Sequence, residues 1–156
     1  MEMNKVLLFC SLGLFSVFAF SGCLKDTPNQ TEVDNNVILQ YIEDNNLNTT
    51  EHASGIHYVL EEPGVGENPA PDAKVEVKYK GYLTSGFVFD ETPENETRTF
   101  ELQGLIVGWQ IAIPLLKPGG KGTFIIPSGL AYGPSGRGPI PPNSVLVFEM
   151  ELVSIK

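Results

Sequence analysis

The feature that most constrains the fold is a series of short segments, all after residue 54, in which apolar and polar residues alternate. The clearest is residues 74–81, where charged side chains at even positions alternate with Val75, Val77 and Tyr79 at odd positions. A period of two places successive side chains on opposite faces of an extended chain. The segment therefore predicts an antiparallel strand with one apolar and one charged face.

Other segments of this kind follow one another along the chain: residues 56–60, 87–90, 98–102, 122–126 and 146–152. Eleven of the 12 prolines and 14 of the 16 glycines also lie after residue 54, where they separate these segments as turn residues do. The sequence therefore predicts five to six short strands joined by tight turns.

Only residues 108–117 have helical character within this region, and Pro118-Gly119-Gly120 ends them. Pro114 lacks an amide hydrogen and is expected to disrupt the last turn. One short helix beside a run of strands predicts an α+β domain, in which a twisted antiparallel sheet of five to six strands wraps around the helix.

The first 22 residues read as a secretory signal rather than as part of the fold. Lys5 precedes an apolar run from Val6 to Phe20, which is shorter than the roughly 20 residues of a membrane span. Ser21-Gly22-Cys23 resembles a bacterial lipobox, which implies a lipid on Cys23 and a mature chain of 134 residues. We expect a lipid-anchored protein of the bacterial cell envelope, on the exported side of the membrane. The alternative is an ordinary Cys23 beside an uncleaved anchor.

Residues 23–54 are expected to form a polar tether followed by one amphipathic helix of about three turns. Thr31, three residues before Asp34, gives a weak capping signal. The apolar positions recur at helical spacing, at Val33, Val37, Ile38, Tyr41 and Ile42. This stripe predicts packing on the domain that follows, and self-association into a dimer is the alternative.

Composition and residue types exclude several classes of function. With 19 acidic and 10 basic residues the net charge is −9, so we expect no nucleic-acid binding. Cys10 would leave with the signal and Cys23 would be acylated, so no thiol remains as nucleophile or ligand. His52 and His57 are the only imidazoles, and no metal-ligand spacing or hydrolase motif accompanies them. The sequence predicts neither a metal centre nor a cofactor.

Several segments of residues 55–156 nevertheless form a recognisable ordered set. The segments are 77–83 (VKYKGYL), 86–92 (GFVFDET), 100–102 (FEL), 106–109 (IVGW), 131–133 (AYG) and 140–152 (IPPNSVLVFEMEL). In this order they resemble the FKBP family of peptidyl-prolyl isomerases.

The resemblance implies an apolar binding pocket with Trp109 as its floor, and catalytic polar groups at Asp90 and Tyr132. The Ile106 N–H would hold a substrate carbonyl. The substrate-binding residues that it implies are Tyr79, Phe89, Phe100, Leu105, Ile106, Trp109, Ile140 and Phe148.

The implied activity is peptidyl-prolyl cis-trans isomerisation, which would accelerate folding of exported, proline-containing polypeptides. Macrolides of the rapamycin type are expected to compete for the pocket. The main alternative is a non-catalytic chaperone or peptide-binding module using the same groove, and a purely structural scaffold is a third reading. No implied pocket position lies before residue 79, so the front helix is expected to be dispensable for catalysis on a short peptide.

Substrate preference follows from the same pocket. An apolar wall should favour Leu or Phe over Glu before the proline, with Asp90 further disfavouring acidic residues. The chain departs from the family pattern at four places: a short Gln103-Gly104 loop, Arg137, a shortened Gly138-Pro139 segment, and Pro114 within the helix. We expect these changes to affect substrate preference more than the basic activity.

Overall fold

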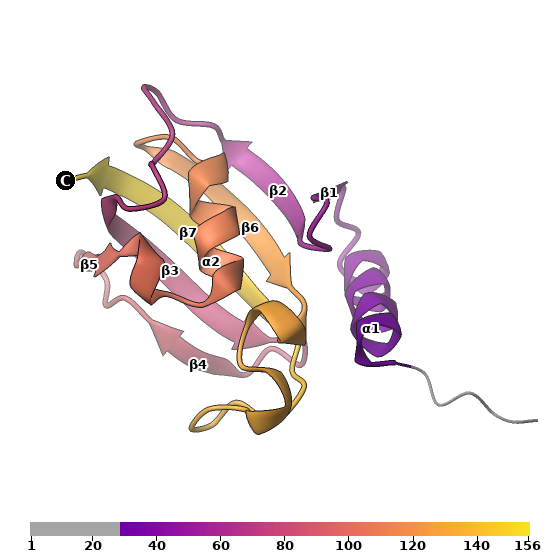
Figure 1. Ribbon diagram of the computed structural model, residues 1–156. Coiled ribbons are helices and arrows are strands. Elements are labelled where there is room, and N and C mark those ends of the chain that lie inside the picture. The colour runs from indigo at the N-terminus through magenta and orange to yellow at the C-terminus, as the bar shows by residue number, and fades with distance from the viewer. Residues whose placement is uncertain (1–28) are drawn as a thin grey trace, which may run out of the picture.

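The computed structural model describes residues 29–156, so the expected signal sequence and Cys23 lie outside the described residues. It contains two α-helices, α1 (Gln30–Asp44) and α2 (Val107–Ala112), and a single sheet (Figure 1). The strands of this sheet are β1 (Thr50–Glu51), β2 (His57–Glu62), β3 (Lys74–Leu83), β4 (Val88–Glu91), β5 (Arg98–Glu101), β6 (Gly120–Ile126) and β7 (Leu146–Ile155). Short 3-10 turns lie at η1 (Leu102–Gly104), η2 (Ile113–Leu115), η3 (Ser128–Leu130) and η4 (Gly133–Ser135).

The sheet is antiparallel at every strand pair, with the order β1-β2-β6-β7-β3-β4. Strand β5 also pairs with β3, so that one edge of β3 is shared by two short strands. Lys74 to Val77 pair with β5, whereas Lys80 to Tyr82 pair with β4. Strands β4 and β5 therefore lie one after the other along β3, so that side chains from all three strands share one face of the sheet.

The predicted α+β class is confirmed, with one difference in the strand count. All six predicted segments are strands, and a seventh, β1, pairs with β2 through Thr50 and Glu51. A two-residue strand carries no readable alternation, which is why the sequence pattern did not indicate it. The sheet therefore begins at Thr50, before the domain boundary expected at residue 55.

The short helix lies across one face of the sheet, as Figure 1 shows. It buries Trp109 and Ala112 against apolar side chains of the strands, among them Val77 and Leu152. The predicted helical segment 108–117 is α-helical only as far as Ala112. It continues as the 3-10 turn η2, where Leu116 donates to the Ile113 carbonyl at 3.0 Å. Pro114 has no amide hydrogen to sustain the α-helical pattern, so the predicted disruption is observed.

The N-terminal helix packs on the opposite face of the sheet, near the end of β6 (Figure 1). Ile38 is fully buried in a second apolar cluster with Ile125, Val145 and Val147. Packing on the domain, the first of the two interpretations of the stripe, is thus confirmed for this residue. Val33 and Val37 remain 37% exposed, and a dimer through this helix stays a prediction.

Two details of this helix differ from the sequence-based expectation. The N-cap is Asn29, whose side chain accepts a hydrogen bond from the Glu32 N–H at 3.0 Å, so Thr31 is not the cap. The helix has 15 residues, about four turns rather than three. Asp34 is buried rather than part of a capping box, because it bonds to the domain. No helix within residues 29–156 is long and apolar enough to cross a membrane.

Candidate active site

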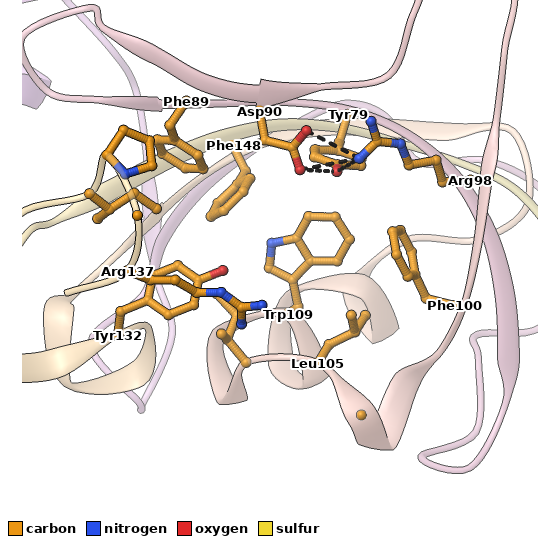
Figure 2. Close-up of a pocket in the computed structure, with 15 residues that line it drawn as sticks. Tyr79, Phe89, Asp90, Arg98, Phe100, Leu105, Trp109, Tyr132, Arg137 and Phe148 are labelled. Atoms are coloured by element: carbon orange, nitrogen blue, oxygen red, sulfur yellow. Dashed lines mark hydrogen bonds and ion pairs between the residues drawn. The ribbon is translucent and has the colours of Figure 1, made fainter. Parts of the chain in front are cut away.

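A cavity of about 700 Å³ lies between α2, strands β3 to β5 and the loop after β6. Its floor is the indole of Trp109, which is only 5% exposed (Figure 2). Three aromatic rings meet this indole: Tyr79 at 4.9 Å with an interplanar angle of 82°, Phe148 at 5.3 Å and 87°, and Phe100 at 5.9 Å and 88°. Such edge-to-face pairs hold one another in fixed orientations. The cavity is therefore a rigid apolar bowl.

The wall formed by Phe89 and Phe148 depends on a glycine in β3. Phe89 packs edge-on against Phe148, with ring centroids 5.6 Å apart and an angle of 81°. A Cβ at Gly81 would stand 2.7 Å from atoms of both rings. Only a residue without a side chain leaves room for this pair, so Gly81 is required for the shape of the pocket.

One edge of the bowl is polar and tightly connected. The Tyr79 hydroxyl donates to Asp90 Oδ2 at 2.5 Å and accepts from Arg98 Nη1 at 2.6 Å. Arg98 also donates to both Asp90 oxygens at 3.1 and 3.2 Å. Burial and the hydrogen bond to Asp90 raise the pKa of Tyr79, so its hydroxyl stays protonated at physiological pH. Figure 2 shows this triad above the Trp109 ring, with Asp90 facing the cavity.

The opposite edge is the entry to α2. Ile106 caps this helix, and its carbonyl accepts from Trp109 N at 2.9 Å and Gln110 N at 3.2 Å. Within residues 29–156 the Ile106 N–H donates to no backbone carbonyl. Gln110 Nε2 donates to the carbonyls of Leu105 at 2.8 Å and Gln103 at 3.3 Å. The shortened Gln103-Gly104 loop is thus fixed by Gln110, beside a backbone donor that is available to a ligand.

The last wall is the loop that carries Tyr132. Arg137 and Ile140 exchange two backbone hydrogen bonds of 2.9 Å, forming a tight hairpin over Gly138-Pro139. The Arg137 guanidinium lies over the Tyr132 ring, 5.6 Å from its centroid. Figure 2 shows both side chains at the mouth of the cavity, with the Tyr132 hydroxyl directed inward. Within residues 29–156, the side-chain hydrogen bonds around the pocket link Tyr79, Asp90 and Arg98 to one another and Gln110 to the carbonyls of Leu105 and Gln103. The Tyr132 hydroxyl takes no part in them.

The family model for FKBP-type peptidyl-prolyl cis-trans isomerases matches residues 66–153. The chain belongs to this family. It is 46% identical over 105 residues to a probable FKBP-type peptidyl-prolyl cis-trans isomerase FkpA of Neisseria meningitidis, covering 66% of this chain and 39% of that protein. It is 39% identical over 105 residues to outer membrane protein MIP of Legionella longbeachae, covering 66% of this chain and 45% of the relative.

A solved FKBP structure has the same arrangement. The crystal structure of FkpA from Escherichia coli matches with a TM-score of 0.72 and 37% identity, over 81% of this chain and 63% of that one. The matched region amounts to about two fifths of the length of the curated FkpA relative. The comparisons therefore establish the family and fold of the domain.

The structure brings every sequence-predicted pocket residue to this one FKBP cavity. Its lining contains all ten predicted positions: Tyr79, Phe89, Asp90, Phe100, Leu105, Ile106, Trp109, Tyr132, Ile140 and Phe148. Their individual roles stay predictions. The cavity has further lining residues, of which Arg98 is the one that sequence reasoning missed entirely. Arg98 and Phe100 stand two apart on β5 and so share a face, a signal that could have placed Arg98 beside the pocket.

Two features of this FKBP pocket bear on its chemistry. The Trp109 indole N–H has no hydrogen-bond partner within residues 29–156, so the floor is apolar apart from one free donor. No group of three His, Cys, Asp or Glu side chains suited to a metal ion lies within the same residues. The pocket thus offers a ligand an apolar surface and a few hydrogen-bond groups.

Proposed function

We propose that the protein is a peptidyl-prolyl cis-trans isomerase that acts on proline-containing segments of exported polypeptides. The observation that carries this proposal is the rigid aromatic bowl with Trp109 as its floor. Its apolar surface fits a pyrrolidine ring, and the polar groups stand at its edges, where the flanking peptide would lie. Membership in the FKBP family supports the same conclusion.

Isomerisation of an X-Pro bond requires no bond to break. The barrier of about 20 kcal/mol comes from amide resonance, which is lost when the C–N bond twists. The planar amide is more dipolar than the twisted form, so an apolar cavity destabilises the ground state relative to the transition state. A site without nucleophile or metal can accelerate this reaction because it needs only to bind the twisted form more tightly.

The polar groups supply orientation in this proposal. The free Ile106 N–H holds a carbonyl of the substrate beside the proline, while the Tyr132 hydroxyl and Asp90 face the rotating carbonyl. Since Arg98 and Tyr79 hold Asp90 in a single geometry, this edge needs little reorganisation when the amide twists. Arg98 is thus a positioning residue for Asp90.

A protease-coupled assay on a short Leu-Pro-Phe peptide tests the activity. We expect catalysis that a rapamycin-type macrolide inhibits, and faster refolding of a protein whose slow phase is proline isomerisation. Binding of the peptide without catalysis would support the alternative, a non-catalytic chaperone or peptide-binding module. Absence of both binding and catalysis would refute the proposal and leave the scaffold reading.

We also propose that the protein is lipid-anchored at Cys23 in the bacterial envelope, on the exported side of the membrane. The support is the Ser21-Gly22-Cys23 motif after an apolar run, together with the relative from Legionella longbeachae that is named an outer membrane protein. The Cys23→Ser variant should lose membrane association or remain as a precursor. Unchanged mass and unchanged membrane partition in this variant would contradict the anchor.

A further inference from the structure

The N-terminal helix reaches the domain through one buried polar contact. Asp34, on the second turn of α1, is only 3% exposed. Its Oδ2 accepts from the Ser128 N–H and from the Ser128 hydroxyl, both at 2.7 Å. Its Oδ1 accepts from Gln30 Nε2 at 2.7 Å. Three donors therefore satisfy this carboxylate, and within residues 29–156 it forms no ion pair.

Ser128 lies at the start of the loop after β6 that carries the pocket residue Tyr132. Ser128 is 1% exposed and begins the turn η3, which Pro127 separates from the end of β6. In this turn Leu130 donates to the Pro127 carbonyl and Ala131 donates to the Ser128 carbonyl, each at 3.0 Å. Tyr132 is the next residue of the chain and lines the cavity. Only one short turn separates the anchored serine from the pocket tyrosine.

The other side of the turn η3 packs on α2. A Cβ at Gly108 would stand 3.2 Å from the Leu130 carbonyl oxygen and 2.5 Å from the Ile126 side chain. The turn is thus held between Gly108 of α2 on one side and Asp34 of α1 on the other. Because charge-assisted hydrogen bonds to a buried carboxylate are stronger than neutral ones, the loss of Asp34 removes the firmer of these two supports.

We infer that Asp34 is a positioning residue for Tyr132, acting through Ser128. This inference rests on the proposed isomerase function and makes α1 part of the catalytic unit. The expectation that the front helix is dispensable for catalysis on a short peptide considered pocket-lining residues alone. A helix that touches no substrate still affects the rate when it fixes the loop that does.

The test compares Asp34→Ala, Asp34→Asn and a matched control, Ile38→Val, in the full-length protein. Ile38 is a buried residue of the same helix and packs in an apolar cluster that contains no residue of η3, so its truncation weakens helix docking but leaves the hydrogen bonds to Ser128 in place. The first readout is amide hydrogen exchange at Leu130 and Ala131, which reports the order of the turn without reference to activity. We expect exchange about tenfold faster in Asp34→Ala and unchanged in Ile38→Val.

The second readout is a double-mutant cycle in kcat/KM with Tyr132→Phe. We expect Asp34→Ala to lower kcat/KM by about threefold in the wild-type background, the range for a misplaced neutral hydrogen bond. In the Tyr132→Phe background the same change should have almost no effect, because the group it positions is already missing. Asp34→Asn retains an acceptor for Ser128 and should recover most of the rate.

The outcomes separate the two proposals. Equal loss in both backgrounds, or unchanged exchange at Leu130 and Ala131, would overturn the positioning role while the isomerase function stands. An inactive wild type would overturn the isomerase function, and the exchange measurement would still decide whether Asp34 orders the turn. If Asp34→Ala does not fold, Ser128→Ala takes its place: it removes one of the two bonds, and additive kinetics in that variant would equally contradict the inference.

Discussion

The Asp90→Ala variant distinguishes the proposed catalytic role of Asp90 from its contribution to the stability of the fold. The Asp90 and Arg98 side chains are 46% and 41% exposed, so water screens their ion pair, which contributes about 0.2–1 kcal/mol. The Tyr79 hydroxyl keeps its contact with Arg98 but loses its acceptor. The loss of this hydrogen bond lowers the free energy of unfolding by about a further 1 kcal/mol. We therefore expect the free energy of unfolding to fall by about 1–2 kcal/mol, and the domain to stay folded.

The effect on activity should be larger than this loss of stability explains. We expect kcat/KM in the peptide assay to fall by about tenfold or more, equivalent to about 1.4 kcal/mol of transition-state stabilisation. The matched control is Glu62→Ala, which breaks the pair between Lys121 and Glu62, 2.9 Å apart and 40% and 59% exposed, on the outer side of the sheet. It should cost similar or less stability and leave kcat/KM unchanged.

Two results would refute this reasoning. A folded Asp90→Ala protein with the wild-type kcat/KM would show that the carboxylate has no part in catalysis. An equal loss of kcat/KM in Glu62→Ala would show that the assay reports destabilisation. Circular dichroism melts of each variant establish that the comparison is made between folded proteins.

Three further predictions concern the wall, the mouth of the pocket and the far end of β3. Phe89→Ala removes the edge-on partner of Phe148 and should lower kcat/KM by about tenfold and the free energy of unfolding by about 3 kcal/mol. Wild-type kinetics in the folded variant would contradict the assignment of Phe89 to the pocket wall. Arg98 already neutralises Asp90, and Arg137 forms no ion pair within residues 29–156. A Glu-Pro peptide should therefore be turned over about twofold faster than a Gln-Pro peptide, which reverses the expectation drawn from Asp90 alone. The Arg137→Gln variant should abolish this difference, and a preference of the wild type for Gln-Pro would contradict the prediction. The hydrogen bond from Lys156 lowers the pKa of Glu76 to about 2. The stabilising effect of the ionised Glu76 is therefore complete above the unfolded pKa of 4.5 and is lost as pH falls towards 2. In urea melts, the free energy of unfolding of Glu76→Gln should match that of the wild type at pH 2 and lie below it at pH 6, and a constant difference across this range would contradict the assignment.

Much of the domain could be predicted because its signals are local. The alternation of Val75, Val77 and Tyr79 with charged residues depends only on neighbours in the chain, and Leu146 to Leu152 follow the same rule. The shift to a 3-10 turn at Pro114 is also a local effect of a missing amide hydrogen. The pocket residues could be named because family motifs carry them in order along the chain.

Contacts between distant segments could not be predicted in this way. Asp34 and Ser128 are 94 positions apart, and nothing in the pattern around either residue indicates that they meet. The helical stripe predicted an apolar contact with the domain, but Val33 and Val37 stay partly exposed while the acidic Asp34 is buried. A buried carboxylate depends on three donors supplied by the folded structure, which no local pattern encodes.

The central claim is that the bowl over Trp109 catalyses rotation about the X-Pro bond, and exchange spectroscopy on a proline peptide tests it most directly. Cis and trans signals of a Leu-Pro peptide are followed with the protein at about one hundredth of the peptide concentration. Uncatalysed exchange takes tens of seconds at 25 °C, so cross-peaks between the isomers at a mixing time below one second require catalysis. We predict such cross-peaks with the wild type and their loss on adding a rapamycin-type macrolide. Signals that shift on binding without exchange cross-peaks would contradict the claim.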